Sequence, residues 1–165
     1  REQFYYAREL TYHGRDKEAV KVLKRFLNNK NGWVENKIEA CRILSQCFTR
    51  LGAPEKAFSA LLKSFRFGPP RAELCCDIGQ FFFDRSDFFT SSYWYKCALS
   101  CKRNDTSGGF ILPDCYGYIP LIQLCVCSYH MGNVAQAAAY NEKAGKIKPN
   151  DPAYQYNRKF FEQAF

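Results

Sequence analysis

The chain has 165 residues, a length typical of one domain. Hydrophobic residues make up 47% of it and charged residues 24%, a balance that excludes a disordered chain. The formal net charge is +8, but no run of five basic residues and no RNA-binding aromatic motif accompanies it, so we predict no nucleic-acid site. No apolar run approaches the length of a membrane-spanning helix, and we predict no membrane association. Because the chain begins at Arg1, inside a predicted helix, we interpret it as a piece of a longer protein.

The sequence has nine cysteines and two histidines, His13 and His130. No pair of cysteines has the C-x-x-C spacing of a zinc site, and an odd number does not form a complete disulfide framework. We therefore predict no metal and no cofactor. Most of the thiols are expected to be small buried side chains kept reduced, which favours a cytoplasmic protein.

A repeat organises the chain around four turns, at Gly14, Gly52, Ser86 and Gly132. Seven residues before these turns stand small residues, namely Ala7, Ser45, Gly79 and Cys125. Five residues after the turns stand Ala19, Ala57, Ser91 and Ala137. Two antiparallel helices approach each other closely only where side chains are small. The pattern therefore predicts a helical hairpin at each turn, with glycine suited to the left-handed end of the first helix.

In chain order, we predict hairpins over residues 2–27, 36–66, 71–101 and 118–147. A last helix is expected over 151–164, with Asp151 as its cap and Pro152 in its first turn. The turns are separated by 38, 34 and 46 residues. The longer spacings indicate short insertions near residues 28–33 and within 102–118.

These spacings and small residues resemble the tetratricopeptide repeat (TPR), which has a period of 34 residues. The resemblance implies an all-α fold, an alpha-alpha superhelix or TPR solenoid, with four helix hairpins and a C-terminal capping helix. It implies one array over residues 1–165, without strands. The repeats would cover about 2–31, 36–70, 71–103 and 118–150, with the capping helix over 151–164.

Three stretches carry a second resemblance, and they contain Phe4-Tyr5-Tyr6-Ala7-Arg8, Pro113-Asp114-Cys115-Tyr116 and Pro149-Asn150-Asp151-Pro152. Together they resemble the C-terminal repeat region of bacterial family 2 glycosyltransferases, a group that includes prophage-encoded enzymes. In that group a nucleotide-sugar domain precedes the repeats. The resemblance implies a bacterial parent enzyme whose own N-terminal catalytic domain, or a homodimer partner, contacts this region.

The chain itself lacks the chemistry of such an enzyme. It has no Asp-x-Asp pair to hold a divalent ion and no glycine-rich phosphate loop. We predict no catalytic residue and no enzymatic activity for the fragment. Two functions remain. One is an accessory module of a glycosyltransferase that self-associates or holds an acceptor. The other is a free-standing TPR adaptor that binds a peptide segment of a partner protein.

In this repeat class the first helices of the pairs line a concave groove, and helical spacing from the turns predicts which side chains face it. The candidate binding residues are Arg8, Tyr12, Arg42, Gln46, Arg50, Gln80, Phe83, Asp84, Tyr129 and His130. The three arginines favour a peptide with an acidic end. We expect their joint replacement by glutamate to leave the fold intact but to impair the capture of an acceptor or partner by the full-length protein. The alternative is a solvated groove without a ligand.

The second insertion, within residues 102–118, is too apolar for a loop that is exposed to solvent along its whole length. Its candidate docking residues are Phe110, Ile111, Leu112, Tyr116 and Tyr118. Burial of these side chains is favourable, and two surfaces could bury them. The one we favour is the surface of the chain's own helices. The alternative is a catalytic domain or a second copy of the chain.

Overall fold

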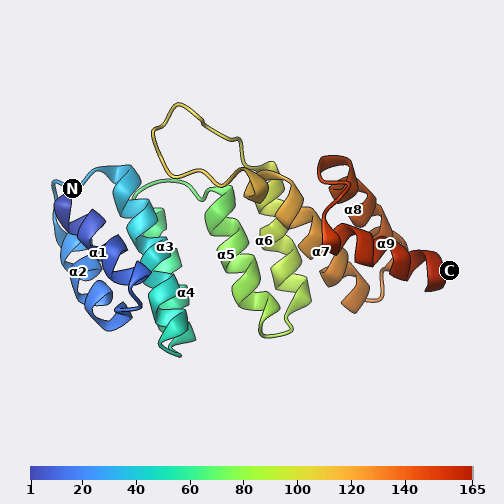
Figure 1. Ribbon diagram of the computed structural model, residues 1–165, viewed down its shortest axis with the longest axis horizontal. Coiled ribbons are helices and arrows are strands. Elements are labelled where there is room, and N and C mark those ends of the chain that lie inside the picture. The colour runs from blue at the N-terminus through green and yellow to red at the C-terminus, as the bar shows by residue number, and fades with distance from the viewer. Residues whose placement is uncertain (165) are drawn as a thin grey trace. The chain divides into compact units, whose positions relative to one another are not determined.

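The computed structural model describes residues 1–164, which form helices and no strand (Figure 1). In chain order the elements are α1 (Glu2–Tyr12), α2 (Asp16–Asn28), α3 (Val34–Arg50), α4 (Pro54–Lys63), the 3₁₀ turn η1 (Ser64–Arg66), α5 (Ala72–Phe83), α6 (Phe88–Ser100), the 3₁₀ turn η2 (Pro113–Tyr116), α7 (Tyr118–His130), α8 (Val134–Ile147) and α9 (Pro152–Ala164). Within this described part, the predicted fold class is confirmed, with four helical hairpins followed by a last helix. No helix among these residues is both long and apolar enough to cross a bilayer.

The helices belong to two compact units. Unit 1 comprises residues 1–70 together with 104–110, and unit 2 comprises 71–103 together with 111–165. Unit 1 contains α1–α4, and Figure 1 shows them from blue to cyan, packed as neighbouring pairs. Unit 2 contains α5–α9, each packed on the next. The sequence-based expectation of one continuous array stays a prediction.

All four predicted turn residues adopt the left-handed conformation. The φ angles of Gly14, Gly52, Ser86 and Gly132 are 68°, 69°, 59° and 81°. In each turn the following residue donates its N–H back across the helix end, namely Arg15 to Leu10, Ala53 to Phe48, Asp87 to Phe82 and Asn133 to Ser128. These bonds satisfy carbonyls that a helix end would otherwise leave free. Ser86 makes the same turn as the glycines, although a Cβ disfavours that conformation.

Small side chains lie at helix crossings of both units, and the repeat pattern predicted those at Ala7, Ala19 and Gly79 but not the one at Gly145. Ala7 and Ala19 are fully buried between α1 and α2. In unit 2, a Cβ added to Gly79 would lie 3.0 Å from the Tyr95 ring, and one added to Gly145 would lie 2.3 Å from the Tyr154 ring. A side chain at either glycine would displace the aromatic ring, so these two positions set how closely α5 and α6, and α8 and α9, approach.

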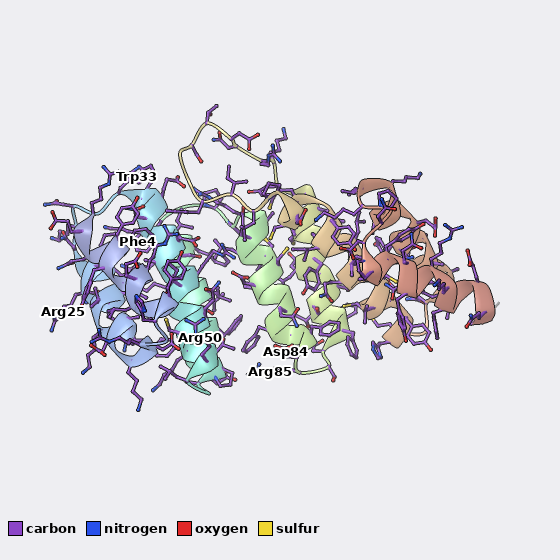
Figure 2. The ribbon with its side chains drawn as sticks, in the orientation of Figure 1. Phe4, Arg25, Trp33, Arg50, Asp84 and Arg85 are labelled. Carbon is purple, nitrogen blue, oxygen red and sulfur yellow. The ribbon has the colours of Figure 1, made fainter. Side chains whose placement is uncertain are left out.

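The core of unit 1 is built on aromatic and aliphatic side chains of its first three helices. Phe4 of α1 is fully buried, and its ring centroid lies 5.7 Å from that of Phe26 on α2. Figure 2 marks Phe4 in the interior of this group of helices. The cluster continues through Leu23, Leu44 and neighbouring residues. The hydrophobic faces of these helices therefore meet in one core.

The second insertion is divided between the two units. Residues 104–110 belong to unit 1, where the Phe110 ring lies 5.7 Å from Phe4 and Gly108 lies against the Trp33 side chain. In unit 2, the Leu112 N–H and the Tyr116 hydroxyl donate to the buried Glu73 carboxylate over 2.8 and 3.0 Å.

These contacts are the ones expected if the insertion packs on the chain's own helices. Tyr118 is buried and Ile111 is half-buried, whereas Leu112 is exposed. Docking of these five residues onto another molecule stays a prediction.

All nine cysteines lie in the described part of the chain, and none of them forms a disulfide bond there. Seven are buried, and Cys97 and Cys101 are partly exposed. Burial raises the pKa of Cys41 and Cys47 to about 12 and that of Cys125 to about 11. Because the thiolate is the reactive form, these three side chains act as small apolar groups at neutral pH.

Candidate functional site

The predicted groove arginines of unit 1 have three different environments. Arg8 on α1 is partly exposed and surrounded by rings, with its guanidinium carbon 5.1 Å from the Phe110 centroid and 5.9 Å from those of Tyr5 and Tyr12. It also donates to the Tyr12 hydroxyl over 2.9 Å. No carboxylate in the described residues pairs with Arg8, so its guanidinium is available to an incoming acidic group.

Helical spacing predicted that Arg42 faces solvent, but the structure buries it. Its side chain is only 7% exposed, and its guanidinium donates to Glu39, one turn earlier on α3, over 3.2 Å. A glutamate at this position would place a buried acid beside the partly buried Glu39 carboxylate. We therefore correct the expectation that replacing the three arginines by glutamate leaves the fold intact.

Arg50 is committed to an ion pair between helices. Figure 2 marks it on α3, and its guanidinium donates two hydrogen bonds to the Asp16 carboxylate at the start of α2, over 2.9 and 2.6 Å. These bonds hold the pKa of Asp16 below its ordinary value. Arg50 thus links two hairpins of unit 1. Gln46 on the same helix is exposed.

We expect Arg50→Ala to lower the free energy of unfolding by about 1–2 kcal/mol at pH 7, because it leaves the buried Asp16 carboxylate unpaired. A lowered folded-state pKa stabilises the protein above the ordinary carboxyl pKa and loses that effect as the pH falls through the folded value. The difference from wild type should therefore shrink progressively below the ordinary value of 3.8. Urea unfolding at several pH values measures it.

Arg25→Ala is the control, since Arg25 is an exposed arginine on α2 with no carboxylate partner among residues 1–164. It should change the free energy of unfolding by no more than about 0.5 kcal/mol. An Arg50→Ala difference that stays constant down to pH 2 would contradict the role of the pair.

In unit 2 the predicted residues of α5 are held by neighbours. Gln80 donates to the Asp84 carboxylate over 2.7 Å and accepts a bond from the buried Tyr95 hydroxyl over 3.2 Å. The Phe83 ring lies 5.4 Å from Phe88 of α6 in an edge-on arrangement. These contacts orient the helix end and leave Asp84 exposed.

The structure joins three of the predicted residues into a row of rings in unit 2. Phe83 contacts Phe88, and Phe88 stacks on His130 with the two centroids 4.2 Å apart and the planes within 5°. His130 is followed by Tyr129 at 5.9 Å, and Tyr129 by Phe160 of α9 at 5.3 Å. The row thus runs from α5 through α6 and α7 to the last helix.

A cavity of about 260 Å³ lies at the end of this row, between α7 and α9. We call it the α7–α9 groove, and its lining residues are Cys125, Val126, Tyr129, Tyr156, Asn157, Phe160 and Phe161. Tyr129, Tyr156 and Phe160 are exposed aromatic residues. Aromatic side chains bury large areas on binding and are enriched at energetically important contacts. The groove therefore suits bulky apolar groups.

The contribution of α9 was missing from the sequence-based set. Tyr156 and Phe160 stand four residues apart, a spacing that places both on one helix face. That spacing was a usable signal. The sequence analysis predicts only a capping role for this helix, which leaves its outer face out of the candidate binding surface.

The described residues contain no group of three or more His, Cys, Asp or Glu side chains that could hold a metal ion. His13 and His130 lie on different hairpins, in unit 1 and unit 2. His130 is engaged in ring stacking with Phe88.

The fold is shared with solved structures. PilF of Pseudomonas aeruginosa has a TM-score of 0.70 and 13% identity, over 95% of this chain and 64% of that one, so the chain spans less than two thirds of it. TTC0263, a thermophilic TPR protein of Thermus thermophilus, has a TM-score of 0.67 and 19% identity, over 98% and 80% of the two chains. YrrB, described as a TPR protein with an unusual peptide-binding site, has a TM-score of 0.51 and 13% identity, over 95% and 90%.

No family model matches the chain, and no curated protein matches it in sequence. At these identities the likeness concerns the fold alone. The chain has the helical-hairpin fold of TPR proteins, and the comparisons carry no link to glycosyltransferases.

Proposed function

We propose that the chain is a non-catalytic protein-interaction module that binds an extended polypeptide segment. The observation that carries this proposal is the α7–α9 groove, where Tyr129, Tyr156 and Phe160 are exposed around one cavity. A peptide-binding site in YrrB, a protein of the same fold, supports the class of ligand. On unit 1, the unpaired Arg8 guanidinium among aromatic rings suits an acidic residue of the same class of ligand.

The test uses the purified chain to select peptides from a random phage-displayed library. We expect peptides with bulky apolar side chains. Joint replacement of Tyr129 and Phe160 by alanine should weaken their affinity at least about tenfold, because the variant removes two rings of the groove. Both side chains are partly exposed, so the helical circular-dichroism signal should be unchanged.

Phe89→Ala is the matched control, since this ring is 79% exposed on α6 and lies outside the groove. It should bind the selected peptides as wild type does. Selected peptides with acidic residues should also be weakened by Arg8→Ala. The absence of any saturable peptide binding, or equal affinity for wild type and the double variant, would contradict the proposal.

The parent protein is a second question. We propose that the module is the C-terminal repeat region of a bacterial, cytoplasmic glycosyltransferase, used for self-association or for docking an acceptor, a partner or its own catalytic domain. The support is the sequence resemblance in residues 4–14, 113–127 and 149–161. The alternative is a free-standing TPR adaptor. The coding sequence upstream of Arg1 separates the two, because a nucleotide-sugar domain there supports the first and an immediate start codon supports the second.

A further inference from the structure

A larger cavity, of about 780 Å³, lies in unit 2 between α6 and the start of α8. We call it the α6–α8 cavity, and its lining residues are Ser92, Lys96, Ser128, Met131, Gly132, Asn133, Val134, Ala135, Gln136 and Tyr140. It shares none of these residues with the α7–α9 groove. No residue of the lining is acidic, whereas one is a lysine, so the cavity favours an anionic occupant.

The first turn of α8 presents backbone donors to this cavity. The first helical bond runs from the Ala137 N–H to the Asn133 carbonyl, and the Asn133 side chain does not cap the helix. The N–H groups of residues 134–136 therefore have no acceptor within the helix. α8 is 14 residues long, and the aligned peptide dipoles of such a helix add partial positive charge at this end.

Ser128 provides an independent sign of a ligand. The residue is only 3% exposed and lines the cavity. No acceptor or donor in residues 1–164 hydrogen-bonds its hydroxyl, whereas the nearby Ser91 and Ser92 hydroxyls donate to the carbonyls of Gly79 and Phe89. Its oxygen is not fully enclosed by protein, so the hydroxyl is open to the cavity, where an oxygen-rich ligand would supply the partner it lacks.

Lys96 adds a full positive charge. It lies on α6, lines the cavity and forms no ion pair with a carboxylate of the described chain. The site thus offers three kinds of donor: backbone amides, a hydroxyl and an ammonium group. A carboxylate has two oxygens in one plane, whereas a phosphoryl group has three terminal oxygens in different directions.

We propose that the α6–α8 cavity binds the phosphoryl group of a small organic phosphate monoester. The phosphoryl oxygens accept from the first-turn amides of α8, the Ser128 hydroxyl and Lys96. Met131 and Tyr140 provide apolar surface for the organic part, and a cavity of about 780 Å³ has the size of a small-molecule site. This site is independent of the peptide-binding function.

The test is a titration of the ¹⁵N-labelled chain with phenyl phosphate, followed by NMR at constant ionic strength. We expect saturable shifts of the Val134, Ala135 and Gln136 amide signals. Inorganic phosphate should shift the same signals with weaker affinity, because it lacks the apolar part. Acetate should produce at most small, non-saturating shifts. Saturable binding of acetate with equal affinity would overturn the assignment to a phosphoryl group.

Three variants test the donors. Lys96→Gln should weaken phenyl phosphate binding about tenfold, since a charge-assisted bond is lost. Ser128→Ala should weaken it about threefold to tenfold. Ala135→Asp should abolish it, because a carboxylate in the first turn occupies the amide donors while favouring the helix itself. Lys146→Gln is the matched control, removing the same charge from an exposed position near the other end of α8.

Each result bears on the proposal. Equal affinity in Lys96→Gln and Lys146→Gln, or unchanged binding in Ala135→Asp, would overturn it, as would the absence of saturable shifts in the first turn of α8. If Ser128→Ala disturbs the packing, as thermal unfolding would reveal, Lys96→Gln and Ala135→Asp decide the outcome. Both of these replace exposed residues.

Discussion

Gly145→Ala is expected to detach α9 from α8. A Cβ at this position would lie 2.3 Å from two ring atoms of Tyr154, far inside van der Waals contact. Tyr154 is buried, so the ring has little room to move aside without carrying its helix with it. Overpacking costs about 1–3 kcal/mol, and we expect the upper end of this range. Urea unfolding measures the loss, and limited proteolysis should cut α9 first.

The matched control is Gly68→Ala in unit 1. The nearest atom to an added Cβ there is Ile38 Cδ1 at 3.6 Å, an ordinary contact. The free energy of unfolding of this variant should lie within about 0.5 kcal/mol of the wild-type value. A small increase is expected if the alanine restricts the unfolded chain. A stronger check combines Gly145→Ala with Tyr154→Ala. Once the ring is gone, the added methyl group should cost little, so the two changes should be strongly non-additive.

Detachment of α9 is expected to affect only one of the two proposed sites, so the Gly145→Ala variant can distinguish them. Four of the seven residues that line the α7–α9 groove come from α9, whereas no residue of α9 lines the α6–α8 cavity. Gly145→Ala should therefore abolish peptide binding and leave phenyl phosphate binding unchanged. Loss of both activities together would indicate that unit 2 unfolds as a whole. Retention of peptide binding would contradict the position given to the groove.

The helical hairpins could be predicted from the sequence because the repeat encodes them locally. The turn residues Gly14, Gly52 and Gly132 and the small residues seven before and five after them recur at fixed offsets, and each needs only its neighbours in the hairpin. Ser86 weakened the pattern in the third copy, yet it adopts the same positive φ. The surrounding turn bonds, including Asp87 N–H to the Phe82 carbonyl, impose the conformation on a residue that does not favour it.

The site could be predicted only in part, since helical spacing gives the direction of a side chain but not what it meets. Arg50 was placed correctly on an exposed part of α3, but its partner Asp16 lies 34 residues earlier in the sequence. Arg42 was placed in solvent and is buried beside Glu39. The α6–α8 cavity combines residues of three helices, and no sequence motif marks such a combination.

Phe4→Ala is expected to cost unit 1 about 3–5 kcal/mol of its free energy of unfolding, the usual loss for deleting a buried phenylalanine ring. The ring is fully buried and lies 5.7 Å from both Phe26 and Phe110. Its removal leaves a cavity and deletes the ring on which Phe110 packs, so residues 104–110 lose a contact that holds them on unit 1. Urea unfolding should show the loss, and a protease should cut the loop between α6 and η2 more rapidly than in wild type.

Phe89→Ala deletes the same ring from an exposed position and should stay within about 0.5 kcal/mol of wild type. A double-mutant cycle between Phe4→Ala and Phe110→Ala then isolates the contact of the insertion with α1. We expect a coupling energy of about 0.5–1.5 kcal/mol, as for other aromatic pairs. Additive effects would mean that Phe110 is not seated on Phe4 in solution. In that case the apolar insertion is available to another molecule, as the docking hypothesis requires.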